Sequence, residues 1–243
     1  MRILIHGASG RMGKAVIEAT QDHPEFEITA KVDADDDIRS VIEDCDAAID
    51  FSSPEGTITF ARAAASFGKA MVIGTTGHTP EQKKLVNEIL WNVPTVWSGN
   101  FSIGVNLLFY LTQKAAEVLG DGFDPEIMEM HHRMKKDSPS GTADRLLEIL
   151  MKARRLKREN VTHGREGMVG KRPDNEIGVH ALRGGDVIGE HTVIFSGIGE
   201  QIELKHKASS RAVFAEGALR AAKWAVSKRP GLYDMQDVLG LRP

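Results

Sequence analysis

The densest group of titratable side chains in the sequence lies at residues 131–137, in the run HHRMKKD. His131 and Lys135 are four positions apart, so their side chains share a face whether the segment is a strand or a helix. An imidazole gives up a proton near neutral pH, and a lysine supplies a positive charge or, when its pKa is lowered, a second proton. The spacing therefore predicts a site where two groups deliver protons to one substrate.

A predicted anion-binding turn follows directly. Pro139 leads into Ser140, Gly141 and Thr142 at the start of an expected helix. Free N–H groups at a helix N-terminus bind carboxylates, and the helix dipole strengthens that binding. A cationic segment beside such a turn predicts a pocket for a small acid, whereas a solvated surface is the commoner fate of clustered charges.

Other kinds of chemistry fit these residues less well. Adjacent histidines on a strand point to opposite faces, and no nearby cysteine or carboxylate set completes a ligand shell around His131 and His132, so we expect no metal. The nucleophile elbow GxSxG of many serine hydrolases is missing. The single cysteine, Cys45, lies among acidic residues in EDCDAAID, which disfavours a reactive thiolate.

A glycine-rich segment near the N-terminus predicts a dinucleotide site. The apolar run ILIH leads into GASGRMG, whose GxxGxxG spacing differs from the GxGxxG of many dehydrogenases. Glycines there allow a tight turn and let backbone N–H groups approach a pyrophosphate. The candidate cofactor contacts in this loop are Gly7, Ala8, Ser9, Gly10, Arg11 and Met12.

Asp33 ends the second expected strand, twenty residues after Gly13. Its carboxylate can accept hydrogen bonds from the adenosine ribose and repels a 2′-phosphate, and no arginine follows it directly. We therefore expect NADH to be preferred. NADPH is the alternative, because Lys31 and Arg39 could soften the discrimination. The structural alternative for Asp33 is that it only caps a turn.

Two groups of small residues follow the fourth and fifth expected strands. Ligands of open parallel sheets bind outside the carboxyl ends of strands, so these residues are candidate nicotinamide and ribose contacts, although each group could form a plain turn. They are Gly74, Thr75 and Thr76 in the first group, and Ser98, Gly99, Asn100 and Phe101 in the second.

The elements that must position these residues begin with an α/β domain. Short apolar runs alternate with helical segments, which predicts a Rossmann-type parallel sheet. The expected strands cover 3–6, 27–32, 47–51, 70–74 and 95–98, and the expected helices begin at Arg11, Pro54 and Pro80. We place this dinucleotide-binding domain at residues 1–103.

The pattern changes at Gly104. A helix over about 104–119, the strand EIMEM and a helix opening at SGTADRLLEIL precede three alternating runs, VHALR, HTVIF and QIELKHK. Because these runs lie close together in the sequence, we expect a mixed, mainly antiparallel sheet in an α+β substrate-binding and oligomerisation domain at 104–213. The segment from about 214 to 243 is expected to dock back on the first domain.

Composition narrows the class of protein. Of 243 residues, 41% are hydrophobic and 27% are charged, as in ordinary globular domains. The formal net charge of -3 gives no field that would attract nucleic acid or an anionic membrane. No apolar run approaches the roughly 20 residues of a membrane span, and the N-terminus lacks the long apolar segment of a signal peptide, so we expect a cytoplasmic protein.

In this order, the motifs resemble those of the 4-hydroxy-tetrahydrodipicolinate reductase family, also called dihydrodipicolinate reductases, of the diaminopimelate route to lysine. The resemblance covers nearly the whole chain through GASGRMG, DFSSPE, GTTG, NFSIGVN, HHRMKKDSPSGTA, RGGDVIGEHTVIF and ELKHKASSR. It implies hydride transfer from NADH or NADPH to a small anionic cyclic dicarboxylate. It also implies a homotetramer joined through the C-terminal sheets.

The resemblance assigns roles to individual residues. His131 matches the general acid and Lys135 the second proton donor, while His132, Gly141 and Thr142 match substrate-carboxylate contacts.

Three features depart from this pattern or stay open. Ala34 follows Asp33 where relatives that use both cofactors often carry arginine, which argues against dual use. Arg211 either lines the anionic pocket or serves at a helix start or subunit contact. The segment RGGDVIGEHT is either a strand pair or a substrate contact.

Two other functions compete with the reductase. One is a dinucleotide-sensing binding protein that has lost its chemistry, which the intact His131 and Lys135 argue against. The other is an amino-acid dehydrogenase of similar architecture, such as an aspartate dehydrogenase.

Overall fold

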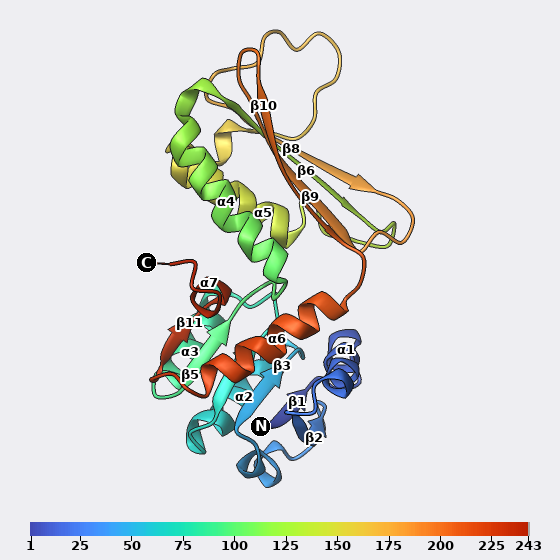
Figure 1. Ribbon diagram of the computed structural model, residues 1–243, viewed down its shortest axis with the longest axis vertical. Helices are drawn as coiled ribbons and strands as arrows, with labels where there is room; N and C mark the ends of the chain where they lie inside the picture. The colour runs from blue at the N-terminus through green and yellow to red at the C-terminus, as the bar shows by residue number, and fades with distance from the viewer. Residues whose placement is uncertain (243) are drawn as a thin grey trace. The chain divides into compact units, whose positions relative to one another are not determined.

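The computed structural model describes residues 1–242, which divide into two compact units. One unit combines Met1–Ile103 with the chain from Arg211 onward, and the other is Gly104–Ser210 (Figure 1). The chain therefore returns to the first unit at Arg211, slightly before the expected residue 214. Each unit has its own sheet and its own apolar core.

The first unit is built on a parallel sheet of six strands in the order β11-β5-β4-β3-β1-β2. Every ladder in it is parallel, so the predicted Rossmann-type sheet is confirmed. Its strands are β1 (Arg2–His6), β2 (Glu27–Val32), β3 (Ala47–Asp50), β4 (Ala70–Ile73), β5 (Pro94–Trp97) and β11 (Gly231–Tyr233).

Helices cover both faces of this sheet. Ile3 and Ile5 of β1 lie in the core under α1 (Arg11–Ala19) and α6 (Ala212–Ala225). Leu4, which points the other way, lies in the core under α2 (Pro54–Ser66) and α3 (Pro80–Ile89). Because both faces are buried, the strands appear in the sequence as nearly continuous apolar runs.

The C-terminal segment completes the first unit. In Figure 1 the red α6 lies against the blue and cyan strands, and β11 extends the sheet beyond β5. Alanines on α6 are fully buried against the sheet, and Gly217 lets the helix approach the Phe101 carbonyl, since a Cβ there would lie 1.8 Å from that oxygen. The short helix α7 (Met235–Val238) follows.

The second unit contains a mixed sheet of five strands in the order β10-β9-β6-β8-β7. Strand β9 pairs antiparallel with β10 and β6, while β8 pairs in parallel with β6 and β7. The predicted mixed sheet is confirmed, although β8 does not pair with the strand that follows it in the chain. The strands are β6 (Asp124–His131), β7 (Val161–Thr162), β8 (Ile177–Arg183), β9 (Gly189–Ser196) and β10 (Gln201–Ala208).

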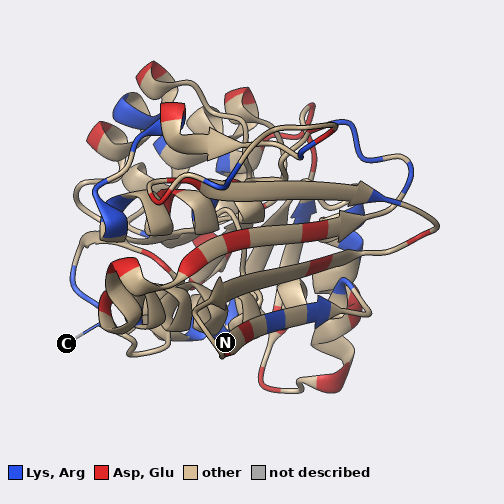
Figure 2. Cartoon of the chain, turned by 90° about the horizontal axis from the view of Figure 1, so that it is seen from above, with Lys and Arg blue, Asp and Glu red and all other residues tan. Residues whose placement is uncertain are grey.

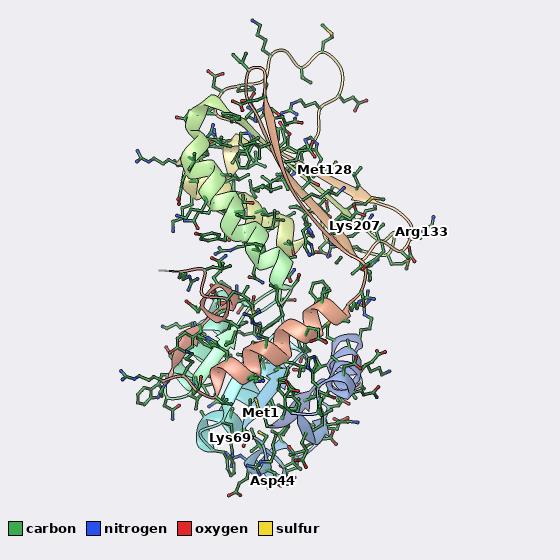
Figure 3. The ribbon with its side chains drawn as sticks, viewed as in Figure 1. Met1, Asp44, Lys69, Met128, Arg133 and Lys207 are labelled. Atoms are coloured by element: carbon green, nitrogen blue, oxygen red, sulfur yellow. The ribbon has the colours of Figure 1, made fainter. Side chains whose placement is uncertain are left out.

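Two helices cover one face of the second sheet. The helices α4 (Ile103–Leu119) and α5 (Gly141–Arg154) pack over inward residues such as Ile127 and Val193. The opposite face carries the side chains of Met128 and Lys207 (Figure 3). Short 3₁₀ turns occupy Thr20–Asp22, Ile38–Ser40, Ile42–Asp44, Gly120–Gly122 and Arg158–Asn160.

Acidic and basic residues are interspersed along the strands and helices (Figure 2). Among the described residues, the helices are all too short or too polar to cross a membrane.

Candidate active site

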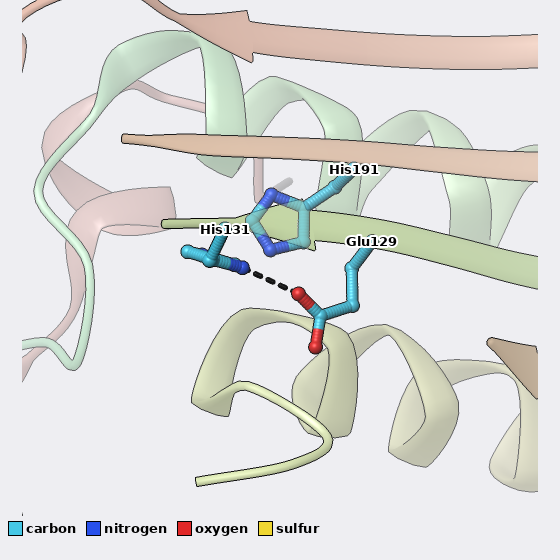
Figure 4. Close-up of side chains that lie close together, drawn as sticks. All are labelled: Glu129, His131 and His191. Atoms are coloured by element: carbon cyan, nitrogen blue, oxygen red, sulfur yellow. Dashed lines mark hydrogen bonds and ion pairs between the residues drawn. The ribbon is translucent and has the colours of Figure 1, made fainter. Parts of the chain in front are cut away.

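His131 is the last residue of β6, and Glu129, two residues earlier on the same face, holds it. The His131 Nδ1 is hydrogen-bonded to Glu129 Oε2 (Figure 4). Glu129 is 1% exposed and His131 is 8% exposed. The period of the strand therefore places a buried carboxylate directly beside the predicted acid.

All the acceptor positions of Glu129 face a donor. Arg183 of β8 is the strand partner of His131. It donates to Glu129 from both terminal nitrogens, at 3.0 Å to Oε2 and 2.9 Å to Oε1. The Ser140 amide donates to Oε1 at 3.1 Å. Burial by itself raises the pKa of Glu129, but the hydrogen bonds from His131 and Arg183 outweigh it and hold this pKa at about 2. Glu129 is thus an ionised, fully satisfied carboxylate.

His191 closes the cluster from β9, where it lies opposite Glu129. Its ring meets that of His131 edge-on, with centroids 5.1 Å apart (Figure 4). Burial, followed by repulsion from His131, lowers the pKa of His191 to about 3, so this histidine is neutral at physiological pH. Its Nε2 lies 3.1 Å from the Ser140 hydroxyl.

Lys135 lies on a loop, because residues 132–140 form neither helix nor strand after β6 ends. The expectation that one strand or helix carries both His131 and Lys135 is therefore wrong. Lys135 Nζ forms an ion pair with Asp137 Oδ2 at 3.0 Å. Its charge also contributes, after burial, His131 and His206, to the low pKa of His191.

Ser140 begins α5 as its N-cap, and its polar groups are used inside the protein. The hydroxyl accepts a bond from the Ala143 amide at 3.2 Å and contacts His191, while the Ser140 amide donates to Glu129. Ser140 is buried, whereas Gly141, the next residue, is exposed. Ser140 is thus placed to organise the cluster, and the exposed Gly141 and partly exposed Thr142 begin the helix.

The cluster also has the form of a metal site, which the sequence did not suggest. Ligand atoms of Glu129, His131 and His191 lie within 4.8 Å of one another. However, the guanidinium of Arg183 already pairs with both oxygens of Glu129, and its positive charge opposes a cation there. These contacts favour holding a proton over holding a metal.

The glycine loop of the first unit has the close backbone approaches that a pyrophosphate loop requires. Gly7 has φ of +77°, and a Cβ there would lie 2.4 Å from the Phe51 carbonyl oxygen. A Cβ on Gly13 would lie 2.2 Å from the Gly7 oxygen. Ala8, Ser9 and Gly10 complete the turn, and α1 begins at Arg11 and Met12.

Asp33, at the end of β2, is tied to this loop. Its carboxylate accepts hydrogen bonds from the Ser9 amide, 3.2 Å from each oxygen, and from the Ser9 hydroxyl at 2.9 Å. The Asp33 amide donates to Asp36 Oδ2 at 2.7 Å. A carboxylate has about four acceptor positions, so Asp33 retains capacity for ribose hydroxyls.

A buried carboxylate that the sequence reasoning missed, Asp50, joins several strand ends. The Asp50 Oδ1 lies 2.9 Å from His6 Nδ1 and 2.6 Å from the Ser52 hydroxyl, while Oδ2 accepts bonds from Thr57 and Thr75. Thr75 is a predicted cofactor contact, but its hydroxyl is directed at Asp50 and it is buried. In the sequence, Asp50 could have been recognised as the single acidic residue within the apolar run AAIDF.

The other predicted cofactor residues lie just after β4 and β5, which are neighbours in the sheet. Gly74 faces the Phe51 ring, since a Cβ there would lie 2.0 Å from it. The Phe101 side chain is buried edge-on against the same ring. Thr76, Ser98, Gly99 and Asn100 are exposed or partly exposed at these strand ends.

The structure also shows the surroundings of Cys45 and the position of Arg211. Burial raises the pKa of the Cys45 thiol to about 11, so it is burial more than the acidic neighbours that disfavours a thiolate. Arg211 occupies the N-cap position of α6, in the first unit.

Comparison with known proteins gives consistent matches over the whole chain. The family described as "Dihydrodipicolinate reductase, N-terminus" matches residues 1–101, and "Dihydrodipicolinate reductase, C-terminus" matches 104–239. The 4-hydroxy-tetrahydrodipicolinate reductase of Akkermansia muciniphila is 51% identical over 98% of both chains, and that of Hahella chejuensis is 46% identical over 99% of both.

Solved structures agree with these matches. The dipicolinate-bound dihydrodipicolinate reductase from Paenisporosarcina sp. TG-14 has a TM-score of 0.80 at 25% identity over 98% of both chains. A probable dehydrogenase from Thermotoga maritima shares the fold, with a TM-score of 0.62 at 13% identity over 99% of this chain and 93% of that one. The chain belongs to the dihydrodipicolinate reductase family.

Proposed function

We propose that this protein reduces 4-hydroxy-tetrahydrodipicolinate to tetrahydrodipicolinate in the diaminopimelate route to lysine. The observation that carries the proposal is the family match over the full chain. In the reaction the substrate gains a hydride and a proton and loses its hydroxyl group as water. The chemistry therefore needs a dinucleotide site, an acid and a site for carboxylates.

His131 is the proposed general acid, and Lys135 is the proposed second donor and a positive charge for the substrate. The buried carboxylate of Glu129 contacts Nδ1 of His131 and holds the imidazole in place for that role. His132, Gly141 and Thr142 are the proposed contacts to the substrate carboxylates. The position of Gly141 and Thr142 in the first turn of α5 fits that role, because a helix N-terminus favours anions.

A bound nicotinamide dinucleotide supplies the hydride. The glycine loop at 7–13 fits a pyrophosphate, and the residues after β4 and β5 fit the ribose and nicotinamide. We propose a preference for NADH over NADPH, because the negative charge of Asp33 repels a 2′-phosphate and Ala34 offers no compensating charge.

The functional unit is proposed to be a cytoplasmic homotetramer. The face of the second sheet that α4 and α5 leave uncovered, its open face, carries apolar side chains that support this. On it, Met128 is 37% exposed and Leu182 is 46% exposed. Exposed apolar patches on sheets commonly mark interfaces.

The direct test follows NADH and NADPH oxidation in separate runs, with substrate generated in the cuvette by the preceding synthase from pyruvate and aspartate semialdehyde. Synthase-dependent loss of NADH that requires this protein, with slower loss of NADPH, is the expected result. Tight NADH binding without turnover would instead favour a dinucleotide sensor. NAD reduction with an amino acid would favour an amino-acid dehydrogenase.

The same assay tests the acid. We expect His131→Ala to lower kcat by about 100- to 10,000-fold, because general acid catalysis contributes that much, while the Kd of NADH stays unchanged. Full turnover by this variant at every pH would remove His131 from the proposed role.

A further inference from the structure

Three residues of the segment RGGDVIGEHT surround His131, although the family resemblance gave this segment no role. Arg183 ends β8, and Gly189 and His191 lie at the start of β9. Arg183 binds the Glu129 carboxylate, Gly189 lies beside Nε2 of His131, and His191 packs against the His131 ring. The ends of these strands thus form the immediate surroundings of the proposed acid.

Hydrogen-bond accounting assigns the proton positions on His131. Glu129 is ionised and can only accept, so the nitrogen that faces it, Nδ1, must carry a hydrogen. Only Nε2 then remains to gain or lose a proton. Because Arg183 and Ser140 occupy the other acceptor positions of Glu129, the carboxylate cannot rotate away from Nδ1 without losing those bonds.

The side of His131 that carries Nε2 is kept open by a glycine. A Cβ on Gly189 would lie 3.1 Å from Nε2, closer than an ordinary van der Waals contact. With hydrogen alone at this position, no side chain of residue 189 crowds the nitrogen that can donate.

His191 fills the adjoining space without adding charge. The Ser140 hydroxyl accepts a bond from the Ala143 amide and lies 3.1 Å from Nε2 of His191. His191 is neutral, because burial lowers its pKa to about 3. The charged or titratable groups around His131 are thus Glu129 on the same strand, Arg183 on β8, His191 on β9 and Lys135 on the loop, with His206 paired to His191 on β10.

Arg183 also connects the two proposed proton donors. Its guanidinium donates to the Asp137 carbonyl at 2.8 Å, and the Asp137 side chain holds Lys135 at 3.0 Å. The backbone strengthens this link, because the Gly184 amide donates to the His131 carbonyl at 2.9 Å and the Arg133 amide to the Gly185 carbonyl at 3.1 Å.

We propose that Glu129 and Arg183 are positioning residues that fix His131 as the Nδ1–H form, with Nε2 as its only proton-donating atom. The segment RGGDVIGEHT is the scaffold that supplies Arg183 and keeps Nε2 accessible at Gly189. This proposal rests on the proposed role of His131 as the acid. It therefore needs a test that does not depend on turnover.

The first test measures the His131 tautomer by ¹⁵N NMR of the whole protein without substrate, above the pH at which the ring is charged. We expect Nδ1–H in the wild type. An Nε2–H tautomer would overturn the proposal whether or not the protein reduces the expected substrate. If the tautomer is Nδ1–H but the coupled assay shows no reductase activity, the proposed function fails while the positioning stands.

The second test is Glu129→Gln. We expect kcat to fall by about 10- to 100-fold, as is typical when a partner that orients a functional histidine is lost, with KM nearly unchanged. The kcat/KM–pH profile of this variant should differ from that of the wild type, because the carboxylate that faces Nδ1 of His131 is lost.

The matched control is Glu126→Gln. Glu126 lies on the same strand but on the opposite face, and it also binds a histidine and arginines: His180 Nε2 at 2.7 Å, Arg165 at 3.0 Å and Arg172 at 3.2 Å. We expect this variant to keep the wild-type pH profile. Equal profiles for the two variants would overturn the proposal.

Two more variants keep the test decisive if Glu129→Gln fails to fold cooperatively. Arg183→Lys retains the charge but loses the two-pronged contact, and should lower kcat in the same way with the fold intact. Gly189→Ala should lower kcat/KM while NMR still reports Nδ1–H on His131. Unchanged kinetics in both variants would rule out the scaffold role.

Discussion

At the scale of single residues, the cluster around His131 combines an ionised acid with a neutral base. Burial, with repulsion from His131, lowers the pKa of His191 to about 3, whereas an unfolded histidine titrates near pH 6.5. Between pH 3 and pH 6.5, His191 binds a proton in the unfolded chain but not in the folded chain, so the free energy of unfolding decreases as the pH falls through this range. Glu129, with a pKa of about 2, adds a loss of stability as the pH falls below about 4.3. Both groups therefore destabilise the second unit in acid.

We predict that His191→Gln flattens the pH dependence of stability between pH 6.5 and pH 3. One proton contributes a slope of at most about 1.4 kcal/mol per pH unit, and the glutamine removes it. Urea unfolding at several pH values measures the effect. The exposed His163 provides the control, because His163→Gln should leave the wild-type slope in place. Parallel curves for wild type and His191→Gln would contradict the pKa assignment.

At the scale of elements, the close contact between the glycine loop after β1 and the start of α1 requires glycine at position 13. A Cβ there would lie 2.2 Å from the Gly7 oxygen and 2.7 Å from the Ala8 Cα, which are backbone atoms that cannot swing aside. We predict that Gly13→Ala displaces the start of α1, lowers the stability of the first unit by about 1–3 kcal/mol or more, and weakens NADH binding.

Fluorescence titration with NADH and a thermal melt measure these two effects. Gly122→Ala is a suitable control, because no atom lies within 4 Å of a Cβ at that position. If Gly13→Ala bound NADH as tightly as the wild type, the loop would not need this close approach.

The strands of the first unit were predictable because both faces of that sheet are buried, so each strand is a distinct apolar run. The pairing of β8 with β6 was not predictable. In the sheet, β6 lies between β8 and β9, although β8 and β9 are consecutive in the chain, and closeness in sequence gives no sign of this insertion. Glu129 was visible in principle, as a charged residue in phase with Ile127 on the inward face of EIMEM. Arg183 and His191 were not, because only the strand register brings them to it.

At the scale of the whole molecule, the open face of the second sheet is expected to join subunits. We predict that the wild type elutes as an assembly of four 26.6-kDa chains and that Leu182→Asp dissociates it, because a charge would be buried in an apolar contact. Light scattering during size-exclusion chromatography gives the mass. Trp91 is the control, since it is exposed on the other unit and Trp91→Asp should not change the mass. A wild-type monomer would refute the assembly.

The first unit takes α6 and β11 from the last part of the chain, and this has a consequence for synthesis on the ribosome. The nascent strands β1 to β5 emerge first, but the helix that covers Ile3, Ile5 and Val72 is translated only after the whole second unit. At about 5–20 residues per second, that delay is on the order of ten seconds. The unit that is begun first is therefore finished last, and the apolar face that α6 covers stays exposed on the newborn chain until then.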